Sequence, residues 1–259
     1  MGQQPVKPAT MFKNQLTIIA LLSASFYFTA CDKDYATFSA KTDGMGGSTA
    51  RFTISGNWLY TVDSKMLTTY NIADPANPSL VNTQQVGFEI ETIFPFADKL
   101  FIGSTSLIHI FSLADPAKPS KLSTAISPEV MRRCDPVVAR DTVAFATLRT
   151  TARCGGTQSL LAVYDIRDIT KPVHRATYPL SSPLGLGYSG NTLYVCDAPG
   201  LLVFDISNPF NPQLKKTIPV NNIFDIIPYN SLLLTQTSSG GAIYDISVPA
   251  SPVKLSDLN

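Results

Sequence analysis

Residues 200–212 read GLLVFDISNPFNP, an apolar run that ends in two closely spaced prolines. The run is typical of a β-strand, and each proline interrupts strand pairing because it has no N–H to donate. The same phrase occurs five times along the chain. The copies begin at Tyr70, Phe111, Tyr164, Phe204 and Tyr244, and they close at Pro78, Pro119, Pro172, Pro212 and Pro252. The phrase therefore marks an internal repeat.

The repeat has a period near forty residues. Successive closing prolines lie 41, 53, 40 and 40 residues apart. The fourth copy contains four β-rich runs, GLGYSG, NTLYVCD, GLLVFDIS and PQLKKTIPV, within residues 185–220. A stacked solenoid uses similar periods, but strand-only repeats with four runs each favour the blades of a propeller. We therefore expect an all-β fold, a five-bladed β-propeller over residues 50–259.

A turn signal separates the first two runs of every repeat. Turns of this kind favour Gly, Asn and Asp, which tolerate the backbone conformations of tight hairpins. The pairs are Gly56-Asn57, Ala97-Asp98, Arg140-Asp141, Gly190-Asn191 and Tyr229-Asn230. The sequence thus predicts a hairpin at the same place in each blade, with the repeated aromatic residue packed in the core between blades.

Composition excludes some functions. The net charge is +1, and no cluster of Lys and Arg with interleaved aromatic residues occurs, so we expect no nucleic-acid partner. The two histidines, His109 and His174, are too few for a multi-histidine metal site. The Asp that recurs in the repeated phrase, at Asp165, Asp205 and Asp245, is better explained by turn capping than by calcium. We expect no metal and no cofactor.

The N-terminal region has the features of an export signal. Residues 16–30, LTIIALLSASFYFTA, carry no charge, follow Lys13 and end directly before Cys31. This run is shorter than the roughly twenty residues of a membrane-spanning helix, and its order is typical of a signal peptide. We expect residues 1–30 to form that signal, with Met11 as an alternative start. The signal can direct a lipid anchor at Cys31, which is considered next. The alternatives are a soluble secreted protein and an uncleaved membrane anchor.

Cys31 follows a small residue and resembles the cysteine of a bacterial lipobox. That resemblance implies lipidation of Cys31 and attachment to the membrane through the N-terminal lipid. The following residues, 32–34, are charged and resemble the surface-export signals of Bacteroidetes lipoproteins. We expect residues 31–49 to be the lipidated cysteine and a flexible tether, and the protein to be an outer-membrane lipoprotein that faces the periplasm or the cell surface.

The repeated phrase resembles the LVIVD repeat, from about Ala50 to Leu258. The likeness to LVIVD-repeat lipoproteins of Bacteroidetes is carried by ARFTISGNWLYTVD (50–63), IETIFPFADKLFIG (90–103), CDPVV (134–138), RCGG (153–156), GLGYSGNTLYVCD (185–197) and FDIIPYNSLLL (224–234). This resemblance implies a β-propeller on the cell envelope, and it implies no particular reaction.

Three further cysteines lie in the repeats. Cys134 begins the first run of the third repeat, and Cys154 lies in the loop that lengthens this repeat. Both locations fall at the same end of an up-and-down blade, and an oxidising compartment permits a bridge, so we expect a Cys134–Cys154 disulfide with Cys196 as a small buried thiol. A three-thiol metal site and a catalytic thiol are the alternatives, each without a supporting partner.

Polar residues gather where the first runs begin, around one mouth of the central channel. They are Arg51, Glu91, Asp135 and Asp225, with Arg132 and Arg133 on the same rim. Opposite charges there can bind a sugar, a peptide or a cation, or they can pair with one another and with the backbone. Because loops on a rigid scaffold usually carry recognition, we take this mouth as the candidate binding site.

Two functions are compatible with these residues. The first is a non-enzymatic binding or scaffold module for an envelope protein or a glycan. The second is a glycan hydrolase or lyase that uses carboxylates at the central channel, for which Glu91, Asp135 and Asp225 are the candidates. No nucleophile elbow, phosphate-binding loop or metal motif occurs in the chain. We therefore expect binding without catalysis, and no catalytic residue is assigned.

Overall fold

The computed structural model describes residues 2, 47–105, 107–126, 133–150 and 158–258, without the side chains of residues 133–135. All of these residues except Gly2 belong to the unit Lys41–Asn259. The described residues contain twenty β-strands and no helix that is long and apolar enough to cross a membrane. Apart from Gly2, the predicted signal peptide, Cys31 and the expected tether up to residue 46 lie outside the described residues.

The strands join in chain order into five four-stranded antiparallel sheets, numbered here as blades 1 to 5. Blade 1 contains β1 (Phe52–Ser55), β2 (Trp58–Val62), β3 (Met66–Asn71) and β4 (Ser79–Gln85), and blade 2 contains β5 (Ile90–Phe96), β6 (Lys99–Ser104), β7 (Leu107–Ser112) and β8 (Ser120–Ile126). Blade 3 contains β9 (Arg133–Arg140), β10 (Val143–Arg149), β11 (Ser159–Asp165) and β12 (Val173–Leu180). Blade 4 contains β13 (Leu186–Ser189), β14 (Thr192–Asp197), β15 (Gly200–Asp205) and β16 (Gln213–Ile218), and blade 5 contains β17 (Ile223–Tyr229), β18 (Leu232–Thr237), β19 (Gly240–Asp245) and β20 (Val253–Leu258).

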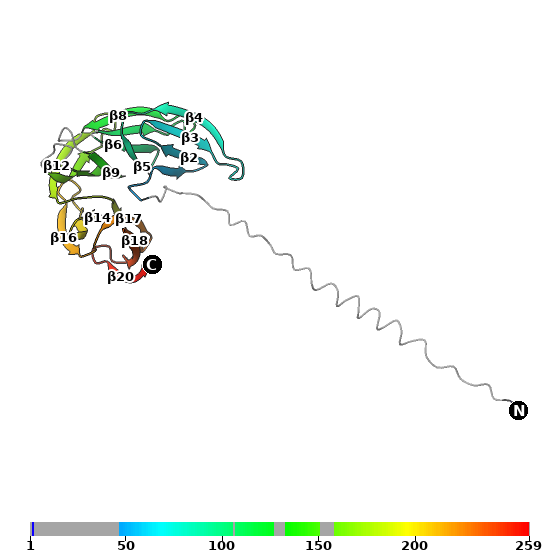
Figure 1. Cartoon of the computed structure of the whole chain (residues 1–259). Helices are drawn as coiled ribbons and strands as arrows, with labels where there is room; N and C mark the ends of the chain where they lie inside the picture. The colour runs from blue at the N-terminus through cyan, green and yellow to red at the C-terminus, as the bar shows by residue number, and fades with distance from the viewer. Residues whose placement is uncertain (1, 3–46, 106, 127–132, 151–157, 259) are drawn as a thin grey trace. The chain divides into compact units, whose positions relative to one another are not determined.

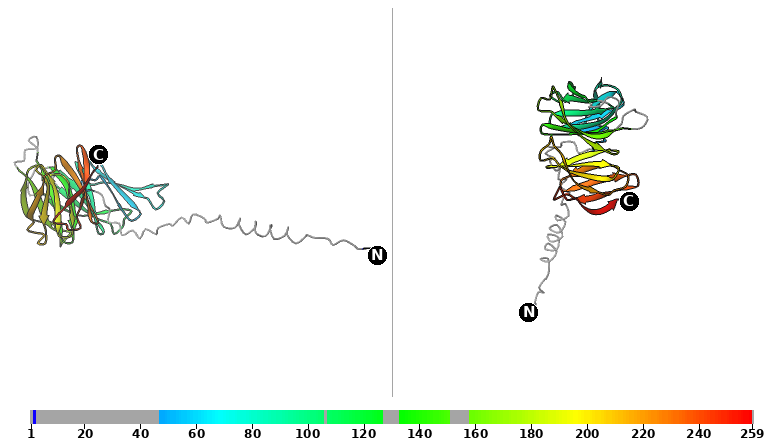
Figure 2. Two further views of the ribbon diagram at one scale, coloured as in Figure 1. Left: turned by 90° about the horizontal axis from the view of Figure 1, so that it is seen from below. Right: turned by 90° about the vertical axis from the view of Figure 1, so that its left-hand side faces the viewer.

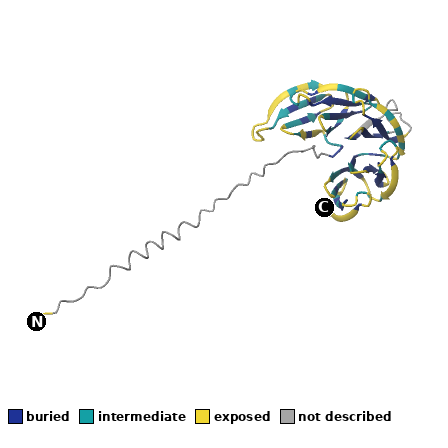
Figure 3. Cartoon of the chain, turned by 180° about the vertical axis from the view of Figure 1, so that it is seen from behind, coloured by how far each residue is buried: buried dark blue, intermediate teal, exposed yellow. Residues whose placement is uncertain are grey.

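The blades follow one another in sequence order around a common centre (Figure 1). The first strands of neighbouring blades contact each other, β1 with β5, β5 with β9, β9 with β13 and β13 with β17. The fourth strands lie on the outside, where their residues are largely exposed (Figure 3). These observations confirm the all-β, five-bladed β-propeller.

Each predicted hairpin is present as a two-residue loop between the first and second strands. The first loop residue has a positive φ of 49–56° in every blade, namely Gly56, Ala97, Asp141, Gly190 and Asn230. In blades 3 and 5 the loop lies one residue later than predicted, because β9 and β17 extend through Arg140 and Tyr229. Asp and Asn tolerate this left-handed conformation better than most residues, which explains Asp141 and Asn230, whereas Ala97 adopts it in blade 2 without that advantage.

The repeated phrase forms the same capped turn in all five blades. Its second residue accepts a hydrogen bond from the backbone N–H two positions later. The pairs are Asn71 with Ala73, Ser112 with Ala114, Asp165 with Arg167, Asp205 with Ser207 and Asp245 with Ser247. This geometry confirms the turn-capping interpretation of the recurrent Asp, because Asn and Ser perform the same role.

The core lies between blades. Among the described residues, four apolar clusters join blades 1 and 2, 2 and 3, 3 and 4, and 4 and 5. The repeated aromatic residues Phe111, Tyr164, Phe204 and Tyr244 are at most 4% exposed and pack on the preceding blade, as predicted. Full burial of such a side chain contributes on the order of 2–3 kcal/mol. Tyr70 departs from the prediction: it is half-buried, and no core cluster of the described residues covers its face of blade 1.

Candidate functional site

The channel mouth predicted from the sequence lies where the first strands begin. Arg51 directly precedes β1 and is exposed, and its carbonyl accepts a 2.8 Å hydrogen bond from Val62 N–H. Glu91 is half-buried in β5, at a point where the register with β6 shifts between Ile90 and Thr92. Asp225 lies near the start of β17 and is buried.

The side chains of the other predicted mouth residues, Arg132, Arg133 and Asp135, lie outside the described part of the chain. Within the part of the chain that the structure describes, no hydrogen bond or ion pair joins Asp225 to Arg51 or to Glu91. The mouth residues therefore remain a prediction as a group.

The segment formed by residues 47–50, named here the latch, lies at this mouth. Gly47 and Ser48 are buried, and Ala50 N–H donates to Gly47 C=O at 3.0 Å, which folds the segment into a turn. The sequence predicts a flexible tether up to residue 49, but Ser48 and Thr49, before the expected boundary at Ala50, already form hydrogen bonds with the propeller.

The latch connects three blades. Ser48 Oγ accepts a 2.7 Å hydrogen bond from Leu186 N–H of blade 4. Ala50 C=O accepts a 2.9 Å hydrogen bond from Ile93 N–H of blade 2. Thr49 Oγ1 donates a 2.5 Å hydrogen bond to Asp225 Oδ2 of blade 5. The start of the propeller domain is thereby tied to its last two blades without an exchanged strand.

The Asp225 carboxyl lies between the latch and Gly185 of blade 4, and Asp225 also lines a hollow of about 410 Å³ in blade 5. Its Oδ1 accepts a 3.0 Å hydrogen bond from Ile226 N–H, so both oxygens have a partner. Burial raises the pKa of Asp225 above its ordinary value, and the hydrogen bond from Thr49 opposes that effect. Because the carboxyl is buried away from water, its ionised form is disfavoured. Its hydrogen bonds give it a structural role.

Two glycines permit this close approach. A Cβ at Gly47 would lie 2.2 Å from Asp225 Oδ2, and a Cβ at Gly185 would lie 2.4 Å from Asp225 Oδ1 and 2.9 Å from Phe224 O. Gly185 N–H also donates a 2.9 Å hydrogen bond to that Phe224 carbonyl. Any side chain at these two positions would displace the carboxyl. Glycine is therefore required because neighbouring atoms lie so close, and not because the backbone has a positive φ.

The cysteines are placed only in part. Cys196 is fully buried and has no disulfide, as predicted. Burial raises its pKa well above the ordinary thiol value, and the charges of Asp225 and Asp197 raise it further, so the thiol is unreactive. Cys154 and the side chain of Cys134 lie outside the described residues, and the disulfide between them stays a prediction.

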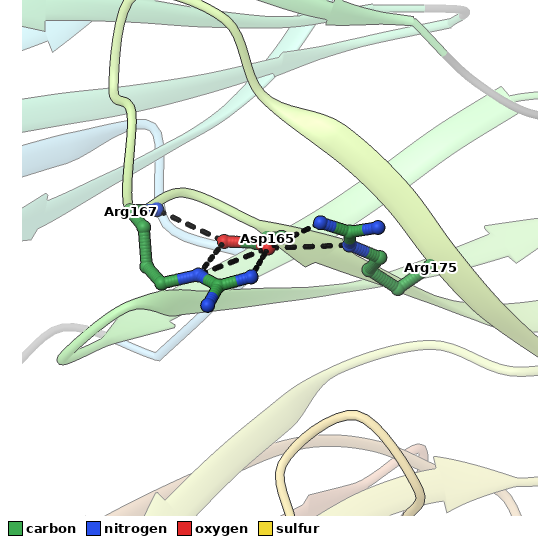
Figure 4. A network of polar contacts seen from close by, with 3 residues as sticks. All are labelled: Asp165, Arg167 and Arg175. Carbon is green, nitrogen blue, oxygen red and sulfur yellow. Dashed lines mark hydrogen bonds and ion pairs between the residues drawn. The ribbon is translucent and has the colours of Figure 1, made fainter.

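A charged cluster at Asp165 was not anticipated from the sequence (Figure 4). The buried Asp165 carboxylate accepts hydrogen bonds from the Arg167 side chain and from Arg175 Nη2 at 2.8 Å. The hydrogen bonds from Arg167, together with those from Arg175, hold the pKa of Asp165 well below its usual range against the effect of burial. Arg167 also lies 5.7 Å from the Phe210 ring of the next blade, which makes the cluster a contact between blades.

His109 is a buried histidine of blade 2. It is buried in β7, and its Nδ1 has no hydrogen-bond partner among the described residues. Burial lowers its pKa to about 4, with a smaller contribution from Lys121. The described residues contain no group of three or more His, Cys, Asp and Glu side chains that could hold a metal ion.

Comparison with known proteins agrees with the fold and does not assign an activity. The LVIVD repeat matches residues 46–85 and 186–219. Similar solved structures include a Lactobacillus plantarum protein, with 14% identity, a TM-score of 0.65, and coverage of 78% of this chain and 67% of that chain. The periplasmic gluconolactonase of Pseudomonas aeruginosa has 11% identity, a TM-score of 0.60, and coverage of 78% and 67%. BamB of Moraxella catarrhalis has 12% identity, a TM-score of 0.52, and coverage of 80% and 62%.

This chain therefore spans about two thirds of the length of those proteins. A comparison with curated protein sequences finds no match. At identities this low the likeness concerns the fold alone, because unrelated functions share the propeller architecture. The LVIVD repeats and the propeller are established for this chain by these findings together.

Proposed function

We propose that this protein is an envelope-anchored lipoprotein whose LVIVD-repeat propeller acts as a non-enzymatic binding or scaffold module for a protein or a glycan. The observation that carries the proposal is the latch at the channel mouth. Residues 47–50 lie against the starts of the first strands of blades 4 and 5, through hydrogen bonds to Leu186 and Asp225. Binding on the outer surfaces of the propeller requires no open channel.

The state of Asp225 supports binding over glycan cleavage. Cleavage by two carboxyl groups requires them about 5–9.5 Å apart on either side of the sugar. Both oxygens of Asp225 accept hydrogen bonds, from Thr49 and from Ile226, and its carboxyl is buried. Two hydrogen bonds and burial hold this carboxyl in place, which favours a structural role for it. The rigid, capped turns of the blades instead suit a platform for recognition.

The binding proposal is tested with the full chain against a glycan array and against envelope extracts with cross-linking. Each captured glycan is then incubated with the protein, and its products are separated. Retention without product supports the proposal. Release of a shortened glycan by the wild type, lost in Glu91→Gln, would show an enzyme and overturn it.

A pair of charge variants locates the surface that binds. Arg51→Gln changes the exposed arginine at the channel mouth, and Lys118→Gln changes an exposed lysine in the turn between β7 and β8. That turn lies at the opposite end of the strands, because successive antiparallel strands reverse direction. Loss of capture in Arg51→Gln alone assigns recognition to the mouth. Equal capture by both variants assigns it elsewhere.

The anchor is tested separately by palmitate labelling in a bacterial host. Residues 16–31 have the order of a lipoprotein signal, so label is expected on the wild type and not on Cys31→Ser. Equal labelling of the two proteins, or none on either, would contradict lipidation at Cys31.

A further inference from the structure

Two hollows lie at equivalent places between neighbouring blades. The blade 3–4 hollow measures about 640 Å³, and the blade 4–5 hollow measures about 500 Å³. Blades 4 and 5 are the adjacent yellow-to-red blades of the right-hand view in Figure 2. Every residue that lines the first hollow, except Gln213, has a counterpart forty positions later in the lining of the second. Forty residues is one repeat, so the two hollows are one feature of the fold with two different linings.

The blade 3–4 hollow satisfies its own polar side chains. Tyr178 Oη donates a 3.1 Å hydrogen bond to Asn211 Oδ1. The buried Asp197 carboxylate accepts hydrogen bonds from the backbone N–H groups of Ser181 and Ser182, the shortest of 2.6 Å. Phe204, which packs beside them, has no polar side-chain atom. This lining therefore leaves few hydrogen-bonding groups for a ligand.

The blade 4–5 hollow has a tyrosine at the position of Phe204. Tyr244 is only 4% exposed, and its hydroxyl has no hydrogen-bond partner among the described residues. Two other buried tyrosines, Tyr60 and Tyr194, donate theirs to the carbonyls of Pro116 and Pro249. Because polar groups that are mostly buried normally have a partner, the Tyr244 hydroxyl is placed to bond to a molecule that enters the hollow.

The same hollow carries an uncompensated positive charge. Lys216 of β16 contributes to the lining, and no ion pair joins it to another residue within the described part of the chain. Lys254 also lines the hollow, but it pairs with Asp257 at 2.5 Å, and the two charges offset each other. Burial raises the pKa of Tyr244, so its hydroxyl remains a donor. The charge favours a ligand that carries a carboxylate.

The rest of the lining suits a sugar ring better than an inorganic anion. Ile218, Val220 and Pro252 give the hollow an apolar part, which can contact the C–H surface of a pyranose. The Asn221 amide, without a hydrogen-bond partner in the residues described, offers both donors and an acceptor to hydroxyl groups. A volume of about 500 Å³ lies in the range of small-molecule sites, about 300–1,000 Å³.

We propose that the blade 4–5 hollow binds an acidic sugar, a uronate within a glycan. Lys216 holds the carboxylate, and Tyr244 and Asn221 bind the hydroxyl groups. The inference rests on the proposed binding function and names the class of glycan and its site. It also places recognition at the third and fourth strands of blades 4 and 5 instead of at the first strands that border the channel.

The test is calorimetric titration of the full chain with tetragalacturonate, with Cys31→Ser in every sample to remove the lipid. The fully methyl-esterified tetrasaccharide keeps the sugar without the charge, and it is expected to bind at least about tenfold more weakly. Tyr244→Phe removes only the hydroxyl and is expected to weaken binding of the acid about tenfold. Lys216→Gln is expected to weaken it by about the same factor and to abolish the preference for the acid over the ester.

The chain offers a matched control for each variant. Tyr178→Phe removes a hydroxyl from the equivalent hollow, where that hydroxyl already bonds to Asn211. Lys215→Gln removes the neighbouring lysine of β16, which lies 3.6 Å from Asp205, and changes the net charge as Lys216→Gln does. Both controls are expected to bind like the wild type. Thermal unfolding shows whether each variant is folded, and Asn221→Ala replaces either test variant that is not.

Four outcomes would each overturn the inference. They are no binding of the acid up to about 10 mM, equal binding of acid and ester, wild-type binding by either test variant, and equally tight binding of a tetraglutamate peptide. Capture of another glycan or of an envelope protein by the same preparation would then leave the proposed binding function standing. The site and the function can therefore fail independently.

Discussion

Thr49 and Asp225, 176 residues apart in the sequence, are joined by a 2.5 Å hydrogen bond from Thr49 Oγ1 to Asp225 Oδ2. This bond fixes the first residues of the propeller domain to its last blade, and it encloses the carboxyl that burial already makes difficult to ionise.

The first prediction concerns this carboxyl and pH. Because the pKa of Asp225 is raised in the folded protein, the folded state holds its proton more tightly than the unfolded state. Its ionisation therefore lowers stability as pH rises above the ordinary value near 4. Asp225→Asn, which keeps the shape without the charge, is expected to match or exceed wild-type stability at pH 7, and its advantage should shrink at pH 4.

Asp225→Ala provides the contrast. It removes both accepting oxygens and leaves Ile226 N–H without that partner, so a loss of about 1–3 kcal/mol is expected. Urea unfolding of both variants across this pH range measures the difference. If Asn and Ala are equally destabilising at pH 7, the charge and not the contact geometry governs the site.

The second prediction compares two glycines, one required by close contacts and one required by a positive φ. Gly185→Ala places a Cβ 2.4 Å from Asp225 Oδ1 and 2.9 Å from a backbone carbonyl, and it is expected to cost about 2–3 kcal/mol or more. Gly190→Ala meets no atom within 4 Å and is strained only by its φ of 54°, at about 1–2 kcal/mol. Thermal unfolding ranks the two. A larger effect at Gly190 would contradict the close approach at Gly185.

The sequence predicted the blades because a period near forty and a repeated capped turn depend on local residues. Asp165, Asp205 and Asp245 were correctly interpreted as turn caps, since an Asx turn needs only neighbouring backbone. The latch was not predicted. GMGGS has the composition of a tether, and its role depends on contacts with Leu186 and Asp225, far along the chain.

Two other features of the structure differ from the prediction because they also depend on neighbours in space. Tyr70 carries the same repeat signal as Phe111, but its burial depends on whether a blade precedes it. The Asp165 cluster needs Arg167 and Arg175 to converge across the turn between β11 and β12. A covering blade lies outside the repeated phrase, and Arg167 stands where the other four copies of the phrase have Ala or Ser, so the pattern that the repeats share reveals neither feature.

The third prediction uses His109. Its folded pKa of about 4 lies below the ordinary value of 6.5, so the unfolded state binds the proton more readily between these values. The unfolding free energy is therefore expected to fall as pH decreases from 6.5 to 4. His109→Gln should flatten that part of the curve. Parallel curves for wild type and His109→Gln would contradict a buried neutral histidine.

The fourth prediction concerns the Asp165 cluster. Hydrogen bonds from both arginines lower the pKa of Asp165, so its stabilising contribution is present at pH 7 and is lost as pH falls below the ordinary value near 4. Asp165→Asn is expected to lower stability at pH 7 by about 1 kcal/mol or less, because both arginines are substantially exposed. Asp205→Asn in blade 4 is the control, and chemical unfolding at pH 7 and pH 3 is the measurement.

The fifth prediction concerns thiols. In the purified Cys31→Ser chain, no thiol is expected to react with a thiol reagent before unfolding, since Cys196 is fully buried with a raised pKa. One thiol should react after unfolding without reductant, and three with reductant, if Cys134 and Cys154 form the predicted bridge. Three reactive thiols after unfolding without reductant would mean that no bridge exists.

The position of the latch also determines the mechanical behaviour of the domain. Tension applied to the chain before Gly47 reaches the propeller at its centre, through hydrogen bonds to blades 2, 4 and 5, and not at an outer strand that can peel away. The load is divided among three sheets before any β-ladder is stretched. A protein held to a surface by its N-terminus would in this way resist shear through contacts with three blades at once.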